Sequence, residues 1–318
     1  MTRIGFHANH EQISPRQLLA DVQHAERAGF AMAMCSDHLH PWSQRQGHSG
    51  YTWSWLGAAL ATTGLSFGCV CAPGQRYHPA IVAQKIGTLA SMFPGRFWTA
   101  LGSGEAVNEI VTGEPWPRKE VRVARLEESV DIIRRLLSGE EVTREGLINV
   151  RNARVWDAPD EVPALIGPAI SPESAARVAG WADGLITINQ DHAVLREVLD
   201  RYAEAGGRGP RVLQVHLSWA PSQAEAEAIA WDQWRSNVFS STVLGDVTEV
   251  STFDELSEHA SPEKVAGAVR ISSDLAQHAA WIAEYADLGF DDIYLHFVGQ
   301  EQRPWLDAAG ETLLPSLR

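Results

Sequence analysis

The end of one apolar segment carries the densest group of chemically active side chains in the sequence. The apolar run 30–34 passes directly into residues 35–42, which include Asp37, His38 and Trp42. A continuously apolar run of this length is typical of a strand buried on both faces in a parallel sheet. Because α/β enzymes keep their chemistry at the carboxyl ends of such strands, these three residues are candidates for an active site.

Other predicted strands also end in polar or titratable groups. The further candidates are Asn9, His10 and Glu11; Cys69, Val70 and Cys71; Gly102, Ser103, Gly104 and Glu105; Asn189, Gln190 and Asp191; His216; and His296. In a barrel the carboxyl ends of the strands converge on one face, so we expect these groups to lie close together. Such a concentration suits proton transfer beside a bound cofactor.

The run from Gly102 to Glu105 lies where a predicted strand passes into a helix. Glycines at such a place allow a planar or anionic ligand to approach the backbone amides. Taken alone, the run is explained as well by a tight turn with Glu105 in the first turn of a helix. It points to a ligand only together with its neighbours.

Two patterns could suggest a metal site, but we expect no metal. His38 and His40 have the spacing of a ligand pair, although a hydrogen-bonded loop explains them equally well. A barrel metallohydrolase would need His216, His296 and further ligands in place. Cys69 and Cys71 share one strand face but lack the second half of a zinc motif, and three cysteines give no disulfide framework.

Strands and helices alternate along the chain. We expect strands at 3–8, 30–36, 65–72, 96–101, 164–167, 185–189, 212–219 and 292–298, and helices at 14–28, 53–63, 80–92, 120–137, 172–181, 192–205 and 274–288. Eight strands with helices between them predict an α/β fold, the (β/α)8 TIM barrel. A doubly wound open sheet is the alternative, but no glycine fingerprint follows the first strand.

Two segments interrupt this alternation. Residues about 140–160 contain short β-like pieces separated by charges, and we expect a hairpin insertion there. Residues about 223–269 are rich in tryptophan and acids and too long for a plain connector. They form either a helical lid over the barrel mouth or a surface insertion with no role in the chemistry. No repeat or linker divides the chain, so we expect one domain over residues 1–318.

The composition limits the possible partners. A formal net charge of -14 repels phosphate backbones, which argues against nucleic acid. No leader opens the sequence and no apolar run is long enough to span a bilayer. We therefore expect a cytoplasmic protein without nucleic-acid or membrane partners. We also expect it to bind a small-molecule substrate and to pair with a second copy of itself as a homodimer.

Taken together, these segments resemble the luciferase-like (bacterial luciferase-type) flavin and deazaflavin oxidoreductases, in the branch that contains F420-dependent glucose-6-phosphate dehydrogenase. Residues 36–42, 76–84 and 102–109 carry the resemblance, which extends over nearly the whole chain. It implies a luciferase-like TIM barrel that uses FMN or F420 for hydride transfer to or from a small organic substrate. The alternatives are an FMN-dependent monooxygenase, a flavin-binding protein without turnover and, more remotely, a TIM-barrel metallohydrolase.

The resemblance implies roles for individual residues. His38, Trp42 and Glu105 would be the catalytic residues around the hydride-transfer site, with His38 or Glu105 moving the accompanying proton. Glu11 would face the substrate. The expected cofactor contacts are Asp37 at the ring edge, Cys69 and Val70 behind the ring at a non-proline cis peptide, and Gly102, Ser103, Gly104, Asn108 and Ser171.

The chain also departs from this branch. Asp191 and Ala268 stand where the sugar-phosphate dehydrogenases carry a lysine and an arginine, so Asp191 would face the substrate as an acid. A dianionic sugar phosphate would meet an acidic wall, which makes glucose 6-phosphate a poor substrate. Residues 171–173 replace the Gly-Gly-Pro turn at the cofactor phosphate, and the sequence leaves FMN and F420 undecided.

Overall fold

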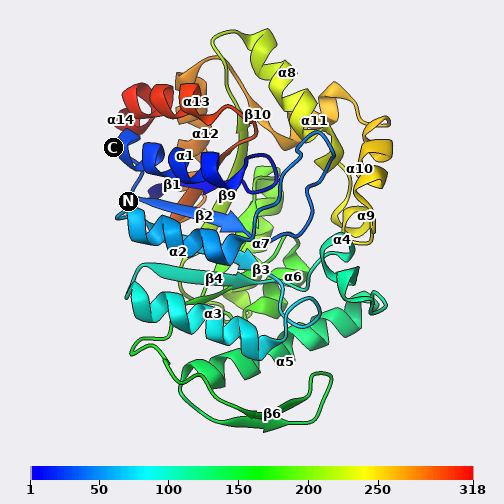
Figure 1. The fold of residues 1–318 in the computed structure, drawn as a ribbon. Coiled ribbons are helices and arrows are strands. Elements are labelled where there is room, and N and C mark those ends of the chain that lie inside the picture. Colours follow the sequence, from blue (N-terminus) through cyan, green and yellow to red (C-terminus); the bar gives the residue numbers. More distant parts are fainter. Residues whose placement is uncertain (1, 318) are drawn as a thin grey trace.

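The computed structural model describes residues 2–317, and within them eight parallel strands close into a barrel (Figure 1). The barrel strands are β1 Arg3–Ala8, β2 Met32–Ser36, β3 Ser66–Cys71, β4 Phe97–Leu101, β7 Leu165–Pro168, β8 Leu185–Ile188, β9 Arg211–Ser218 and β11 Asp292–Phe297. Strand β8 pairs with β9, β9 with β11, and β11 pairs back with β1, so the sheet has no gap. The predicted (β/α)8 barrel is confirmed, and the open-sheet alternative is wrong.

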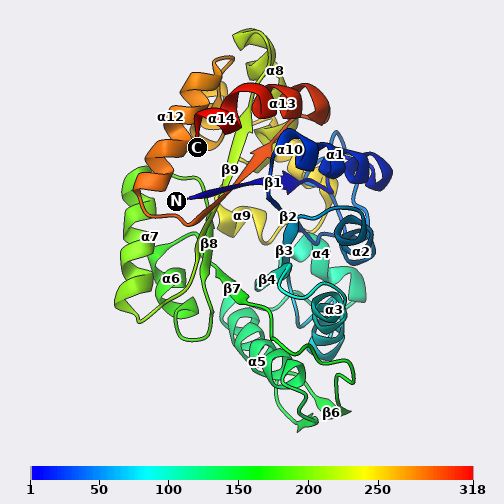
Figure 2. The same ribbon diagram turned by 90° about the vertical axis from the view of Figure 1, so that its left-hand side faces the viewer.

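Helices surround the ring of strands (Figure 2). They are α1 Pro15–Ala28, α2 Thr52–Thr62, α3 Pro79–Met92, α5 Lys119–Leu137, α6 Pro172–Val178, α7 His192–Glu204 and α12 Leu275–Asp287. The ends of α1 follow from local chemistry, because the Ser14 hydroxyl accepts a hydrogen bond from the amide of Gln17 and Gly29 takes a φ of 107°. The C-terminal elements α13 Gln302–Ala308, η3 Ala309–Leu313 and α14 Leu314–Ser316 were not predicted, and the first two pack against α1.

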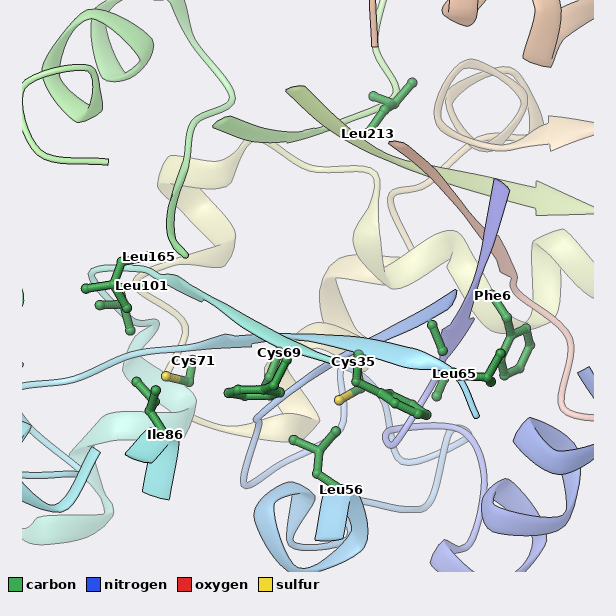
Figure 3. Packing of buried hydrophobic residues seen from close by; sticks show 14 of the residues in the cluster. Phe6, Cys35, Leu56, Leu65, Cys69, Cys71, Ile86, Leu101, Leu165 and Leu213 are labelled. Carbon is green, nitrogen blue, oxygen red and sulfur yellow. The ribbon is translucent and has the colours of Figure 1, made fainter. Parts of the chain in front are cut away.

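The strands bury different residues on their two faces. Outward-facing side chains such as Cys35 and Cys69 pack with Leu56 and Ile86 of the surrounding helices (Figure 3). A second cluster fills the barrel itself and contains Met32, Met34, Ala100, Ile166, Ile186, Val212 and Tyr294. Side chains alternate along a strand, so the inward face continues to the strand ends at the barrel mouth.

The two interrupting segments lie at different places. Segment 140–160 contains the antiparallel strands β5 Val142–Arg144 and β6 Val150–Ala153, at the edge of the molecule in Figure 1. Segment 223–269 contains α8 Gln223–Trp234, η2 Arg235–Asn237, α9 Ser241–Leu244, α10 Val250–Ser257 and α11 Pro262–Ala268. A short strand that was not predicted, β10 Arg270–Ile271, then pairs with β9.

Part of the second segment covers the strand ends. The ring of Phe253 in α10 meets the Trp42 ring edge-on, with centroids 5.4 Å apart. Phe253 and Val247 also pack with Val107, which follows β4. This contact brings the segment to the side of the barrel where the candidate site residues lie. Within residues 2–317, no helix combines the length and apolar character needed to cross a membrane.

Candidate active site

The barrel mouth has one apolar wall. Val70 of β3 and Ile188 of β8 lie on the inward face of their strands, yet Val70 is half-buried and Ile188 is 36% exposed. Gly102, after β4, and Pro168 of β7 lie between them in the barrel order and are also half-buried. Exposed apolar groups inside a barrel border space that a flat apolar ligand can fill.

The opposite wall consists of buried imidazoles and amides. His296 of β11 accepts or donates hydrogen bonds with Asn9 at 2.7 Å and with Gln214 at 3.0 Å, and Gln214 also reaches His216 at 3.1 Å. Trp234 of α8 lies over this wall, with its ring centroid 4.5 Å from that of His216. Burial lowers the pKa of His216 to about 3 and that of His296 well below its usual range, so this wall is polar but uncharged.

Four predicted residues meet at the mouth. The Nδ1 atom of His38 is 2.5 Å from Oε1 of Glu11, and its Nε2 atom is 3.6 Å from Oε2 of Glu105. The indole of Trp42 stands edge-on to the His38 ring, with centroids 4.9 Å apart. Glu11 was expected to face the substrate, but its carboxylate is buried and binds His38. It therefore orients the imidazole.

The two carboxylates control the charge of His38. Burial opposes that charge, but Glu11 and then Glu105 outweigh burial and raise the pKa of His38 to about 9. Burial likewise opposes the charge of Glu11, yet the neighbouring His38 lowers the pKa of Glu11. Burial raises the pKa of Glu105, which is only half-buried at the mouth. At neutral pH the site therefore holds an imidazolium–carboxylate pair beside a more basic carboxylate.

Asp37 points away from this group. Its Oδ2 atom accepts a hydrogen bond from Nε1 of Trp53 at 2.7 Å, and its Oδ1 atom accepts one from the Tyr77 hydroxyl at 3.5 Å. Arg76 donates to the Asp37 carbonyl oxygen at 2.6 Å and also contacts Glu109, which is buried. Arg76, Tyr77 and Glu109 were not assigned roles from the sequence. Their signal was present, since all three lie in the segments that carry the family resemblance.

Asn108 stabilises the loop that holds His38. Its Oδ1 atom accepts hydrogen bonds from the amides of Leu39 at 2.8 Å and His40 at 3.1 Å. Its amide nitrogen donates to Oε2 of Glu105 at 3.3 Å. Asn108 belongs to the short helix α4 Ala106–Glu109, which follows the glycine run. The predicted cofactor contact thus joins both acid–base candidates to one helix.

Within the glycine run, Gly104 is required by its surroundings. Gly104 has a φ of 80°, and a Cβ atom there would lie 2.8 Å from Cγ of Glu109. Gly102, Ser103 and Gly104 are all half-buried beside the mouth. Their backbone is therefore accessible from the mouth, and a ligand contact there stays a prediction.

The expected cis peptide at Cys69 and Val70 is wrong. Within residues 2–317 every peptide bond is trans. Cys69 pairs with Cys35 and Thr99, and Val70 with Ser36 and Ala100, so the strand keeps regular hydrogen bonding on both sides. Val70 faces the mouth, whereas Cys69 faces the helices (Figure 3).

The remaining two predicted residues lie farther around the barrel. Ser171 caps α6, where its hydroxyl accepts a hydrogen bond from the Ser174 amide at 3.3 Å. Asp191 is exposed at the start of α7, after β8, which lies opposite β2 in the barrel order. A ligand bound at His38 would have to extend across the mouth to reach Asp191.

Other residues of the mouth were missed. His7 of β1 stacks on His296 with centroids 4.2 Å apart, and Gln214 joins His216 to His296. His7 lies two residues before Asn9, and Gln214 lies two residues before His216. Since side chains two residues apart in a strand share a face, the predicted strand-end groups could have pointed to both. Among the described residues, no group of three His, Cys, Asp or Glu side chains is arranged to hold a metal ion. The metallohydrolase alternative thus lacks a ligand set there.

Comparisons with known proteins agree with this geometry. The luciferase-like monooxygenase family matches residues 1–292. The F420-dependent glucose-6-phosphate dehydrogenase of Beutenbergia cavernae is 35% identical over 331 residues, covering 100% of this chain and 98% of the relative. The corresponding protein of Microbacterium testaceum is 35% identical over 334 residues, covering 99% and 97%.

Solved structures also resemble this chain. An F420-dependent secondary alcohol dehydrogenase in complex with an F420–acetone adduct has a TM-score of 0.91 and 26% identity, covering 100% of this chain and 99% of its own. The oxygenating constituent of 3,6-diketocamphane monooxygenase from Pseudomonas putida, in complex with FMN, has a TM-score of 0.71 at 15% identity, covering 100% and 99%, and so shares the fold. The chain belongs to the luciferase-like monooxygenase family.

Proposed function

We propose that this protein is an F420-dependent dehydrogenase that transfers a hydride between the deazaflavin ring and the carbon of a small uncharged alcohol or carbonyl compound. The chain is an oxidoreductase that uses F420 or FMN. F420 is favoured over FMN because the relatives at 35% identity and the structure at 26% identity are F420-dependent proteins. The observation that carries the reaction type is the Glu11–His38–Glu105 group beside an exposed apolar wall.

The residues of the mouth fit a flat cofactor ring. Val70 and Ile188 would contact its apolar face, and the backbone of Gly102, Ser103 and Gly104 would lie along its edge. Asp37 would support the ring site from behind instead of touching the ring, because its side chain is only 1% exposed and its Oδ2 atom meets both Nε1 of Trp53 and, at 3.6 Å, Nη2 of Arg76. When bound, the ring of F420 supplies a carbon that accepts or donates a hydride.

The charge of the mouth favours an uncharged substrate. Glu11 and Glu105 are acidic, and Asp191 is exposed across the barrel. The other wall offers neutral imidazoles and amides, and Ala268 contributes its carbonyl oxygen to Asn189. A dianionic phosphate would be repelled here, whereas hydroxyl and carbonyl groups can form hydrogen bonds. Glucose 6-phosphate is therefore excluded from the proposal.

The acid–base roles follow from the charge states. Hydride removal from an alcohol leaves a hydroxyl proton, and Glu105 accepts it because burial has raised its pKa. The His38 imidazolium, held by Glu11, stabilises the negative charge that develops on the substrate oxygen. Trp42 packs beside His38 under Phe253 and limits the access of water. In the reverse direction Glu105 returns the proton.

Two measurements test this proposal. Titration of the purified protein with F420 and with FMN, followed by fluorescence quenching, should give tight binding of F420 and weaker binding of FMN. Turnover is then followed as loss of the visible absorbance of F420 with neutral secondary alcohols and with glucose 6-phosphate, of which only the alcohols should react. Binding of FMN alone with oxygen-dependent product would instead support the monooxygenase alternative. Cofactor binding without turnover would support a flavin-binding protein.

We also propose that the protein acts as a homodimer in the cytoplasm. The dimer is tested by light scattering during size-exclusion chromatography, where a monomeric mass would contradict it. Fractionation of the source cells tests the location.

A further inference from the structure

Lys85 of α3 has a side-chain amine in an unusual environment. Its Nζ atom is inaccessible to solvent and has no hydrogen-bond partner among the described residues. Three aromatic rings surround it, with centroids 3.0 Å away for Tyr77, 5.2 Å for Trp53 and 5.3 Å for Tyr51. An ammonium without hydrogen bonds is costly to bury, and the faces of aromatic rings can offset part of that cost. The arrangement is therefore a cation held by an aromatic cage.

Two rings of this cage also hold Asp37. Trp53 donates from Nε1 to Oδ2 at 2.7 Å, and Tyr77 donates from its hydroxyl to Oδ1 at 3.5 Å. The Arg76 guanidinium lies 4.5 Å from the centroid of the Tyr77 ring. Arg76 also reaches Asp37 directly, with Nη2 3.6 Å from Oδ2, whereas Lys85 makes no hydrogen bond to that carboxylate and acts on it through space and through the two rings.

We propose that Lys85 is a positioning residue of the cofactor site: its ammonium fixes the rings of Tyr77 and Trp53, which in turn hold the Asp37 carboxylate and so fix the strand end that carries His38 beside the cofactor. The inference rests on the proposed cofactor site at the barrel mouth. It assigns a role to a residue of α3 that lies outside the barrel mouth and takes no part in the acid–base group.

The charge of Lys85 gives this role a pH dependence. Burial lowers the pKa of Lys85 to about 8, although the charge of Asp37 acts in the opposite direction. The groups that face Lys85 are Asp37 after β2, Tyr51 and Trp53 at the start of α2, Cys69 and Cys71 of β3, and Arg76 and Tyr77 before α3. Burial raises the pKa of Cys71 to about 12 and also raises those of Cys69, Tyr51 and Tyr77. These thiols and phenols therefore titrate above the range of Lys85.

The first test uses the protein without cofactor. The indole N–H resonance of Trp53, assigned by its loss in Trp53→Phe, reports the hydrogen bond to Asp37. Between about pH 6 and about pH 10 it should shift with a midpoint near 8, and Lys85→Met should abolish that shift. The comparison separates Lys85 from Cys35, whose pKa is lowered to about 7, and from His38, whose pKa is raised to about 9. A resonance that behaves alike in both proteins overturns the inference.

The second test measures F420 affinity by fluorescence quenching over the same pH range. Lys85→Met should weaken binding at neutral pH by roughly 5–30-fold, the size of a desolvated cation–π contact. Wild-type affinity should fall towards that of the variant above pH 8, whereas Lys85→Arg, which stays charged, should keep its affinity. Lys264→Met is the matched control, because Lys264 lies 5.6 Å from the Phe239 ring without a link to Asp37.

The two tests separate the possible failures. If wild-type protein binds no F420, the proposed function fails, and the Trp53 resonance still decides whether Lys85 positions Asp37. If wild-type protein binds F420 and Lys85→Met binds it equally well over the whole pH range, the inference is wrong while the proposed function stands.

Discussion

Replacing Glu11 by Gln tests the charge state of His38 directly. The carboxylate and the imidazole are 2.5 Å apart, and their side chains are only 5% and 19% exposed. Solvent therefore screens the pair weakly, unlike an ion pair at the surface. Gln keeps the size of the side chain and removes its charge, so the substitution isolates the electrostatic contribution.

The expected magnitude follows from the pKa of His38. Its displacement from 6.5 to about 9 corresponds to about 3 kcal/mol of folding free energy. Because the pKa is raised in the folded state, this stabilisation is complete below about pH 6.5 and is lost as the pH rises through about 9. Glu11 has a lowered pKa, so its own contribution is lost only in acid, as the pH falls below 4.5. The difference in unfolding free energy between wild type and Glu11→Gln should thus shrink by about 2–3 kcal/mol from about pH 6 to about pH 9.

Urea unfolding at these two pH values measures that difference, and an NMR titration of the His38 ring gives its pKa in each protein. In Glu11→Gln the pKa of His38 should return to 6.5 or below. Burial lowers this pKa, and only the charge of Glu105 would then remain to raise it. Asp307→Asn is the control, since it breaks a His24 pair of 2.6 Å whose carboxylate side chain is 60% exposed. An unchanged pKa of His38 in Glu11→Gln, or an equal pH effect in Asp307→Asn, would refute the reasoning.

Three further predictions concern the residues around His38. Glu105→Gln and His38→Ala should each lower turnover by roughly 10²–10⁴-fold in steady-state kinetics. Both should leave F420 affinity, measured by fluorescence quenching, nearly intact. Loss of the cofactor from either variant would instead mean that these residues only support the ring. Asn108→Ala should cost about 1–3 kcal/mol in urea unfolding, because the amides of Leu39 and His40 lose their acceptor. Asp254→Asn should raise KM more than it lowers kcat. Asp254 accepts hydrogen bonds from Ser43 at 2.5 Å and Arg45 at 2.8 Å and so connects α10 to the loop after β2. An unchanged KM would mean that α10 is only a surface element.

The barrel was predictable because its signals are local. Apolar segments such as 30–34 and caps such as Ser14 and Gly29 mark each strand and helix without reference to distant residues. Elements without such signals were missed. Strand β10 has two residues, and η3 is a five-residue π-helix that contacts α1, α12 and α13. Neither length carries a recognisable period.

For the candidate site, the convergence of the named residues was more predictable than their contacts. Strand ends of a closed barrel must converge, which is why Glu11, His38 and Glu105 could be named from three separate segments. Which of them bind one another depends on the loops after β1, β2 and β4, whose course no periodicity encodes. The family resemblance placed Glu11 at the substrate, and it gave no sign that the Glu11 carboxylate also binds His38.

The opposite orientations of Asp37 and His38 explain how one strand end serves two tasks. Side chains alternate along β2, so Cys35 faces the helices, and Asp37, two residues on, does the same. His38 then faces the mouth, where it meets Glu11 and Glu105. The cations Arg76 and Lys85 lie with Asp37 on the helix side, and the charge of Arg76 lowers the pKa of His38 by less than Glu11 and Glu105 raise it. This separation lets the mouth remain acidic, as an uncharged substrate permits, while the strand end beside the proposed cofactor site is held from behind.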